Sequence, residues 1–119
     1  RFYFDRHGIE TVCIRIGSSF PEPRDRRMLT SWLSYDDLEQ LVTRSLLTPG
    51  VGHTIVFGAS RNGDAWWDNR LAAHLGYDPK DSSDSHRARV EAAGPPFDPG
   101  DPMGVYQGGA FVTAGPFDD

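Results

Sequence analysis

The sequence is poor in lysine, cysteine and long apolar runs, and each shortage excludes a class of protein. Lys80 is the only lysine among 12 lysines and arginines, and the net charge of −5 does not suit a nucleic-acid-binding surface. Cys13 is the only cysteine, so no intramolecular disulfide can form, and a reducing cytoplasm suits the chain. No apolar run approaches ~18 residues and no basic leader precedes one, so we expect a soluble chain without a membrane span or an export signal.

The composition predicts one small folded domain. Hydrophobic residues make up 38% of the 119 residues, which is enough for a modest core. The four histidines form no metal-ligand spacing with one another or with Cys13, so we expect no metal site. Arg1 is followed at once by three aromatic residues, as if a helix had been cut from a longer chain.

The first third of the chain has the pattern of a strand that follows a helix. Residues 1–7 are typical of the last turns of a helix that ends at Gly8. Alternating β-branched residues then predict a strand over 10–16. Prolines at two positions predict a loop over 17–27. This loop leaves the carboxyl end of the strand, which is the edge where open α/β sheets bind ligands.

The clearest element of the sequence is a helix that begins at Ser34. Ser34 can act as its N-cap, with Asp37 placed as in a capping box, and Pro49-Gly50 ends it. Its apolar stripe consists of Leu38, Leu41, Val42, Ser45 and Leu46. A second strand is predicted over 53–58.

The second half of the chain alternates short helices and loops. We expect helices over 66–75, closed by Gly76, and over 85–93. Asp68 and Asn69 are expected to cap the helix that follows them, and Trp66 and Trp67 to serve packing. We expect residues 97–104 to be irregular and 105–113 to be extended.

These elements together predict an α/β fold with an incomplete parallel sheet. Two or three strands cannot cover their own faces and edges, because a parallel strand needs neighbours on both sides. The sequence therefore favours the C-terminal part of a larger α/β protein.

Several runs of the chain resemble the extended short-chain dehydrogenases, within the NAD-dependent epimerase/dehydratase family. An Arg-containing strand leads into a Pro-containing loop over 14–23, and 32–38 leads into a helix through paired aspartates. Within this superfamily the chain is most similar to uronate dehydrogenases. The matching runs are Gly8–Val12, Ile14–Pro23, Asp25–Met28, Ser60–Asn69, Asp81–Ser83, Val105–Gly109 and Phe111.

This resemblance implies a Rossmann-type NAD-dependent dehydrogenase that oxidises C1 of galacturonate or glucuronate to the aldarolactone. Residues 1–119 would then be its C-terminal fragment, including the substrate-binding region, with the nucleotide-binding half absent. The catalytic Tyr-x-x-x-Lys pair of the family lies on the helix whose tail would be residues 1–7. This chain has neither that pair nor the Gly-rich loop, so we expect no catalytic residue in it and no activity from it alone.

Arg27 and Ser18 are the expected substrate contacts. A guanidinium can bind the carboxylate of a uronate through two parallel hydrogen bonds, and the resemblance places this role on Arg27. The resemblance places a second contact on Ser18, whose hydroxyl follows a strand end. Without the resemblance, an exposed arginine and a turn serine would be the simpler interpretations.

Three further residues are assigned by the resemblance. Ile16 and Gly17 are expected to present backbone groups to the nicotinamide of NAD, and Gly17 would permit a close approach. Phe111 resembles an aromatic residue of the tail that closes over the substrate. A core phenylalanine that pins the tail is an equally good interpretation of Phe111.

Two other functions remain open from the sequence. One is a fragment of a sugar-nucleotide epimerase or dehydratase, although such enzymes need a larger C-terminal region. The other is a non-catalytic module that binds a sugar acid or a protein, which predicts cooperative unfolding of residues 1–119 alone. The sequence also leaves open which uronate is preferred and whether the full-length protein is a homo-oligomer.

Overall fold

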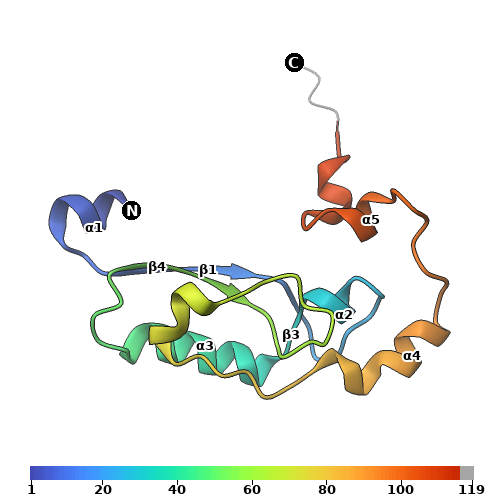
Figure 1. Cartoon of the computed structure of the whole chain (residues 1–119), viewed down its shortest axis with the longest axis horizontal. Helices are drawn as coiled ribbons and strands as arrows, with labels where there is room; N and C mark the ends of the chain where they lie inside the picture. The colour runs from blue at the N-terminus through green and yellow to red at the C-terminus, as the bar shows by residue number, and fades with distance from the viewer. Residues whose placement is uncertain (116–119) are drawn as a thin grey trace.

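The computed structural model describes residues 1–115 and contains a two-stranded parallel sheet flanked by helices. Strands β1 (Thr11–Ile16) and β4 (His53–Gly58) pair along their full length. Between them the chain passes through α2 (Met28–Ser31) and α3 (Tyr35–Leu47), and Figure 1 shows α3 along one face of the strands. The predicted α/β class with an incomplete parallel sheet is confirmed.

A second, smaller strand pair continues from the carboxyl end of β1. β2 (Ser18–Ser19) runs parallel to β3 (Trp32–Leu33), with Ser18 opposite Trp32. The prediction of a loop throughout 17–27 is therefore wrong at its start. The two serines become strand because β3, a buried segment just before α3, offers them backbone partners.

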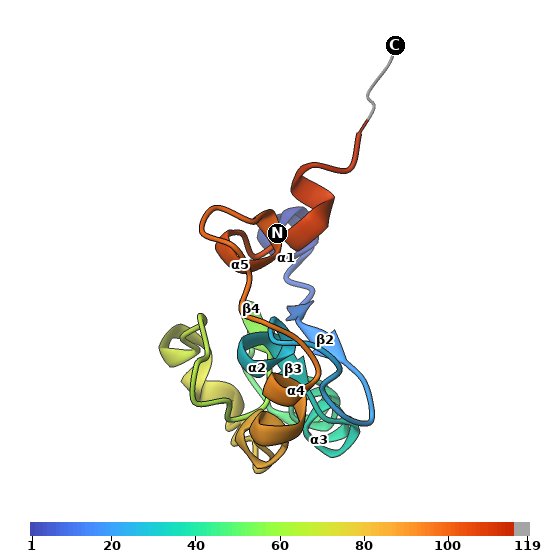
Figure 2. The same ribbon diagram turned by 90° about the vertical axis from the view of Figure 1, so that its right-hand side faces the viewer.

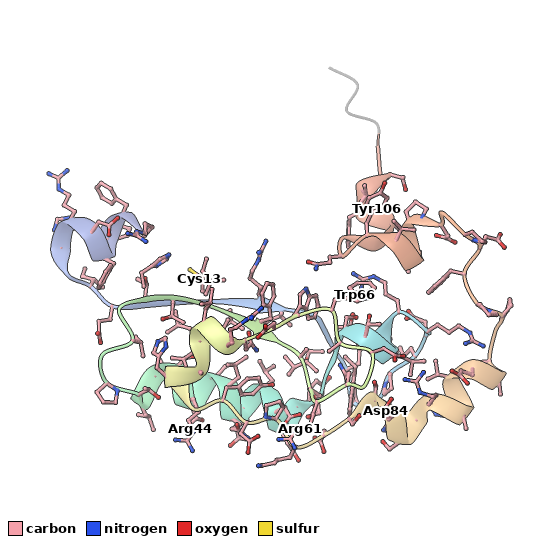
Figure 3. All side chains as sticks on the ribbon, in the orientation of Figure 1. Cys13, Arg44, Arg61, Trp66, Asp84 and Tyr106 are labelled. Carbon is pink, nitrogen blue, oxygen red and sulfur yellow. The ribbon has the colours of Figure 1, made fainter. Side chains whose placement is uncertain are left out.

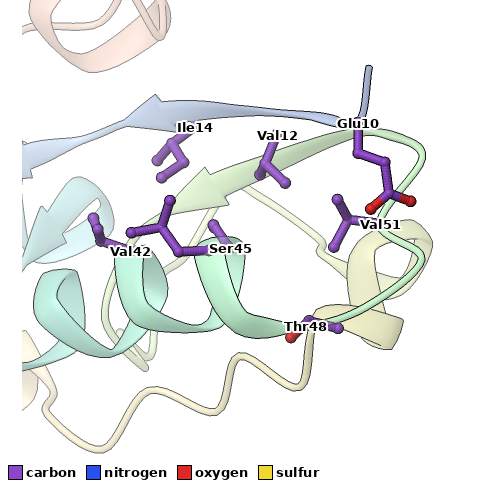
Figure 4. A pocket seen from close by; sticks show the side chains of 8 residues that line it. Glu10, Val12, Ile14, Val42, Ser45, Thr48 and Val51 are labelled. Atoms are coloured by element: carbon purple, nitrogen blue, oxygen red, sulfur yellow. The ribbon is translucent and has the colours of Figure 1, made fainter. Parts of the chain in front are cut away.

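The core lies between the strands and α3, and it covers only part of the helix. Its buried residues are Leu41, Val51, Val56, Ala72 and Leu75. Val42 and Leu46 of the predicted apolar stripe remain 39% and 77% exposed. Both line a hollow of about 340 Å³ beside Val12 and Ile14 of β1 (Figure 4). The stripe is thus wider than a two-stranded sheet can bury.

Of the two hydrogen bonds of the predicted capping box at the N-terminus of α3, only one is present. The Oγ atom of Ser34 accepts the Asp37 N–H at 3.1 Å, but Asp37 does not reach back to Ser34. Its buried carboxylate instead accepts the backbone N–H groups of Lys80 and Asp81 at 2.7 and 3.1 Å. Asp37 therefore ties a distant loop to the start of the helix, and the Ser34 N–H donates to Ser60.

The helix predicted over 66–75 is shorter than expected, because the residues at its start bind the sheet. Only Arg70–Leu75 is helical, as the 3₁₀ turn η1, which ends at Gly76 in the left-handed conformation. Asp68 precedes the N-cap residue Asn69 and accepts the Arg70 N–H at 2.7 Å in a local turn. The expected capping role of Asn69 is wrong, because its amide bonds both the N–H and the carbonyl of Phe57, each at 2.8 Å.

The tail, residues 97–115, is helical where we expected irregular and extended chain. α5 (Pro102–Val105) begins at Asp101, whose carboxylate accepts the Met103 N–H at 2.8 Å. A 3₁₀ turn, η3 (Gly109–Val112), follows. The Asp-Pro pair is an N-cap followed by a proline at the first helical position, and the prediction overlooked this signal. The helix expected over 85–93 is present as η2 (Ser83–His86) and α4 (Arg87–Ala92).

The two ends of the described chain lie on one side of the sheet. α1 (Phe2–His7) ends at Gly8 with φ 66°, as predicted. Figures 1 and 2 show α1 and the tail on the side of the strands opposite α3. Among residues 1–115, the helices are all too short or too polar to cross a bilayer.

Candidate functional site

All five residues expected to contact substrate or cofactor line one hollow at the carboxyl end of β1. This strand-end hollow has a volume of about 430 Å³ and lies between the strand end, α2 and the tail. Its lining residues are Ile16, Gly17, Ser18, Arg27, Met103, Gln107, Gly108, Gly109, Ala110 and Phe111. The first four come from the α/β body and the other six from the tail, so the hollow depends on how the tail folds back.

Gly17 is required by a close backbone contact. A Cβ atom at this position would lie 2.1 Å from the carbonyl oxygen of Ser31 and 3.0 Å from the Trp67 ring. The Gly17 N–H donates to the Gly58 carbonyl at 2.9 Å and so extends the β1–β4 pairing. The close approach that the structure shows is therefore to Ser31 and Trp67, within the body.

Ser18 presents its hydroxyl beside a second serine. The two Oγ atoms of Ser18 and Ser31 are 3.1 Å apart, and either can be the donor. The neighbouring Ser19 does not line the hollow, and its buried Oγ atom has no partner among the described residues. Of the two serines that end the strand, Ser18 is thus the one that faces the hollow.

Arg27 is the one guanidinium in the hollow wall. It lies at the start of α2, and its Nη2 atom donates to the carbonyl oxygen of Gln107 in the tail. Its Cζ atom lies 5.8 Å from the centre of a Trp66 ring, within the range of a cation–π contact. Its Nε atom is buried and has no hydrogen-bond partner among residues 1–115.

The two neighbouring arginines are held elsewhere. Arg24 lies 4.1 Å above the Phe20 ring. Arg26 donates to the Gly94 carbonyl at 3.0 Å and lies 3.7 Å from the carboxylate of Glu91. No ion pair joins Arg27 to a carboxylate within the described part of the chain. The cationic group in the hollow is therefore not neutralised by an acid of residues 1–115.

Phe111 lies at the rim of the hollow with its ring in solvent. It is 88% exposed, so it is not a core residue that pins the tail. Of the two interpretations that the sequence left open, the structure removes the core phenylalanine. An exposed ring at the rim of the hollow is available to the apolar side of a ligand.

The titrating groups with altered acidity lie away from the strand-end hollow. Burial and the nearby charge of Asp37 raise the pKa of Tyr77, whose hydroxyl donates to the Ala59 carbonyl at 2.8 Å. Hydrogen bonds from Arg87 and then Ser82 lower the pKa of Asp84. The hollow itself is lined by no His, Asp, Glu, Tyr, Lys or Cys among the described residues. It can therefore bind and orient a ligand but offers no side chain suited to proton transfer.

Several contacts of the hollow could not be read from the sequence. Trp66 was expected only to pack, yet it lies against Arg27. Gln107 contacts Arg27 through its backbone oxygen, so the identity of its side chain does not predict the contact. Gly108 and Gly109 form a tight turn in which Gly109 has φ 55°.

The comparisons with known proteins agree with this geometry. The chain is 70% identical to a uronate dehydrogenase of Pseudomonas putida over 98% of its own length and 43% of that protein. It superposes on a glucuronic acid dehydrogenase of Chromohalobacter salexigens with a TM-score of 0.92, at 48% identity, over 96% of this chain and 43% of the other.

A third relative carries the cofactor. A variant of the uronate dehydrogenase of Agrobacterium tumefaciens, solved in complex with NAD, superposes with a TM-score of 0.91 at 42% identity, over 96% of this chain and 43% of that one. No protein-family model matches the chain. The chain spans less than half the length of the relatives it matches. At these identities and coverages, the chain belongs to the uronate dehydrogenase family and corresponds to the C-terminal part of its members.

Proposed function

We propose that this chain forms the uronate-binding part of an NAD-dependent dehydrogenase that oxidises C1 of galacturonate or glucuronate to the aldarolactone. Residues 1–119 would be the C-terminal portion of that enzyme, and the nucleotide-binding portion would precede it. The observation that carries the proposal is Arg27, a guanidinium without an acidic partner among residues 1–115, in a hollow at the carboxyl end of a parallel strand. This is the sheet edge where α/β folds bind ligands.

Arg27 would bind the carboxylate that distinguishes a uronate from a neutral sugar. The guanidinium is planar and can donate two parallel hydrogen bonds to a carboxylate. At a net charge of −5 the protein repels anions at long range, so an anionic substrate needs such a local contact. The carboxylate would also neutralise a cation that no acid of residues 1–115 pairs with.

Ser18 and Phe111 would hold the ring of the sugar. The Ser18 hydroxyl lines the same hollow as Arg27 and can donate to or accept from a sugar oxygen. The exposed ring of Phe111 suits the apolar face of a pyranose. Orientation of the substrate is therefore the contribution we assign to this chain.

Ile16 and Gly17 would meet the nicotinamide end of NAD. Ile16 is 54% exposed at the strand end and offers an apolar surface to a flat ring. The N–H of Gly17 already serves Gly58, so the contact we assign to these two residues is through their carbonyl groups and the Ile16 side chain. The residues present thus fit one edge of the nicotinamide only. NAD, when bound, supplies the hydride acceptor.

The proton of the C1 hydroxyl would be removed by residues outside this chain. The strand-end hollow has no lining base within residues 1–115, and the 119 residues contain no Tyr-x-x-x-Lys pair. In the family such a pair lies on the helix that precedes the equivalent of β1. The reaction would then need the N-terminal portion for both proton removal and nucleotide binding.

The compartment and the assembly state belong to the same proposal. Cys13 is exposed and unpaired in the described structure, and a reducing cytoplasm keeps such a thiol free. A homo-oligomer of the intact protein would cover exposed apolar residues such as Leu46 and Leu71.

The experiment is a comparison of Arg27→Ala with Arg24→Ala in the intact protein that contains this chain. Loss of a charged hydrogen-bonded contact of about 1.5–3 kcal/mol should raise the KM for galacturonate about 10- to 100-fold in Arg27→Ala. Arg24 lies over Phe20 and serves as the matched control, with a KM within about twofold of wild type. An unchanged KM in Arg27→Ala, measured by NADH formation, would contradict the assignment.

Product analysis with free uronates and UDP-sugars separates the alternatives, because epimerases and dehydratases are redox-neutral overall and form no net NADH. A sugar-nucleotide enzyme would convert UDP-sugars and leave free uronates untouched. A non-catalytic module would convert neither, and residues 1–119 alone would unfold in one cooperative transition.

A further inference from the structure

The guanidinium of Arg27 lies at the end of a long, flexible side chain. Two other segments, the Gln107–Gly109 turn and Trp66, contact it and fix its orientation. A bidentate contact with a carboxylate requires the plane and the edge of the guanidinium to point correctly. Most buried or semi-buried arginines are oriented by an acidic partner. Arg27 has no ion pair to any carboxylate of residues 1–115, so its orientation depends on other contacts.

The first of these contacts is the turn Gln107–Gly109 in the tail. The carbonyl of Gln107 accepts from Nη2 of Arg27. Gly109 has φ 55°, and a Cβ atom there would lie 3.0 Å from Nε and 3.4 Å from Cζ of Arg27. The backbone of this turn therefore rests directly on the guanidinium, and a side chain at Gly109 would displace one or the other.

The second contact is Trp66, which is linked to the sheet through a chain of rings. Its ring centre lies 5.8 Å from Cζ of Arg27. Trp66 meets Trp67 edge to face at 6.3 Å, and Trp67 stacks flat on Phe57 of β4 with ring centres 5.5 Å apart. Figure 3 shows Trp66 on the side of the body that faces the tail. A series of aromatic contacts thus connects the guanidinium of Arg27 to strand β4 and fixes its orientation relative to the sheet.

These contacts decide which edge of the guanidinium is left for a ligand. Nε is buried, and one hydrogen of Nη2 goes to Gln107. Nη1 makes no hydrogen bond within residues 1–115. The hydrogens that remain are those of Nη1 and the second one of Nη2, which together form the outer edge of the fork.

We propose that Trp66 and the Gln107–Gly109 turn are positioning elements for Arg27, which hold its outer edge toward the carboxylate of the substrate. The proposal rests on the proposed uronate-binding function and names two elements to which the sequence assigned no such role. The tail and the arginine then act as one unit. Uronate binds well only when the tail is docked on the guanidinium.

The experiment uses the intact protein, four single variants, and Arg27→Ala with and without Trp66→Ala. Trp66→Ala removes the ring over Arg27, Trp66→Phe keeps an aromatic face, and Gly109→Ala places a methyl group against Nε. Tyr35→Ala is the matched control, because Tyr35 is an exposed aromatic residue outside the hollow. For each variant we would measure four quantities: KM for galacturonate, KM for NAD, kcat and the thermal midpoint. The Trp66→Ala measurement is then repeated in an Arg27→Ala background.

The expected result is a selective rise in the KM for galacturonate. It should rise about 3- to 10-fold in Trp66→Ala and about 10-fold in Gly109→Ala, and stay within about 2-fold in Trp66→Phe and Tyr35→Ala. KM for NAD should stay near wild type in every variant, and so should the thermal midpoint in the Trp66 and Tyr35 variants. Gly109→Ala should also lower the thermal midpoint, because Gly109 has φ 55° and an alanine is strained there. In the Arg27→Ala background, Trp66→Ala should add nothing, because its effect passes through Arg27.

Two results would overturn the positioning proposal while the proposed function stands. One is an unchanged KM for galacturonate in both Trp66→Ala and Gly109→Ala, with Arg27→Ala impaired. The other is a Trp66→Ala effect of equal size with and without Arg27, or one shared by the KM for NAD and the thermal midpoint. A wild-type protein that oxidises no uronate would instead refute the proposed function, and this proposal with it.

Discussion

At the scale of single residues, the sequence predicts the role of a side chain better than it predicts the residues to which that side chain binds. Arg27 and Ser18 were assigned from the resemblance, and both line the hollow. Asp37 was expected to belong to the start of its own helix, but its carboxylate binds backbone N–H groups 43 and 44 residues away. Such long-range hydrogen bonds leave no mark in local spacing. They depend on where the fold brings two segments together.

Gly17 offers a residue-scale test of the geometry around the hollow. Gly17→Ala should destabilise the protein by about 1–3 kcal/mol or more, because its Cβ would lie 2.1 Å from the Ser31 carbonyl oxygen. Gly94→Ala is the matched control, since a Cβ there meets no atom within 4 Å and its φ is not positive. Chemical denaturation of the intact protein measures both variants. Equal stabilities would show that the Ser31 contact is not rigid.

At the scale of elements, predictions succeeded where one face of a segment is buried against a partner. The strand over 53–58 and the helix after Ser34 appear as predicted, because their apolar periodicity follows their packing. Predictions failed for the tail and for the start of the 66–75 segment, which form short 3₁₀ turns or bind the sheet through side chains. The four-residue turn η3 buries only Gly109, so its sequence carries no apolar periodicity to detect.

The segment η2–α4 is held by charges and gives an element-scale prediction for pH dependence. Hydrogen bonds from Arg87, Ser82 and the Gly63 N–H lower the pKa of Asp84 below its ordinary value. A lowered pKa means that the ionised form stabilises the fold. This contribution is complete above the unfolded pKa of about 4 and is lost as the pH falls through the lower folded value.

Asp84→Asn should therefore reduce the loss of stability as the pH falls below about 4, and it should leave the pH dependence of stability above that range nearly unchanged. The effect should be small, since the side chains of Arg87 and Asp84 are 34% and 44% exposed and water screens them. Asp36→Asn, an exposed acid at the start of α3 with no ion pair in the described chain, is the control. The thermal midpoint followed against pH measures the effect. A wild-type slope in Asp84→Asn would argue against the Arg87 network as its source.

At the scale of the whole molecule, the sheet has one protected edge and one open edge. Asn69 occupies the outer edge of β4 at Phe57 through two hydrogen bonds, as a neighbouring strand would. The outer edge of β1 has no strand beside it among residues 1–115. If further strands precede this chain, as we propose, they pair with β1 and not with β4. The residues that would bind NAD and remove the proton would then lie beside the strand-end hollow.

The measurement that tests the central claim most directly is the preference of the intact protein for galacturonate over galactose. The two sugars differ at C6, where galactose carries a hydroxymethyl group in place of the carboxylate that Arg27 would bind. Arg27→Ala should lower the ratio of kcat/KM for galacturonate to that for galactose about 10- to 100-fold, with the value for galactose nearly unchanged. A ratio equal to that of the wild type would contradict the account, because the carboxylate would then be recognised elsewhere.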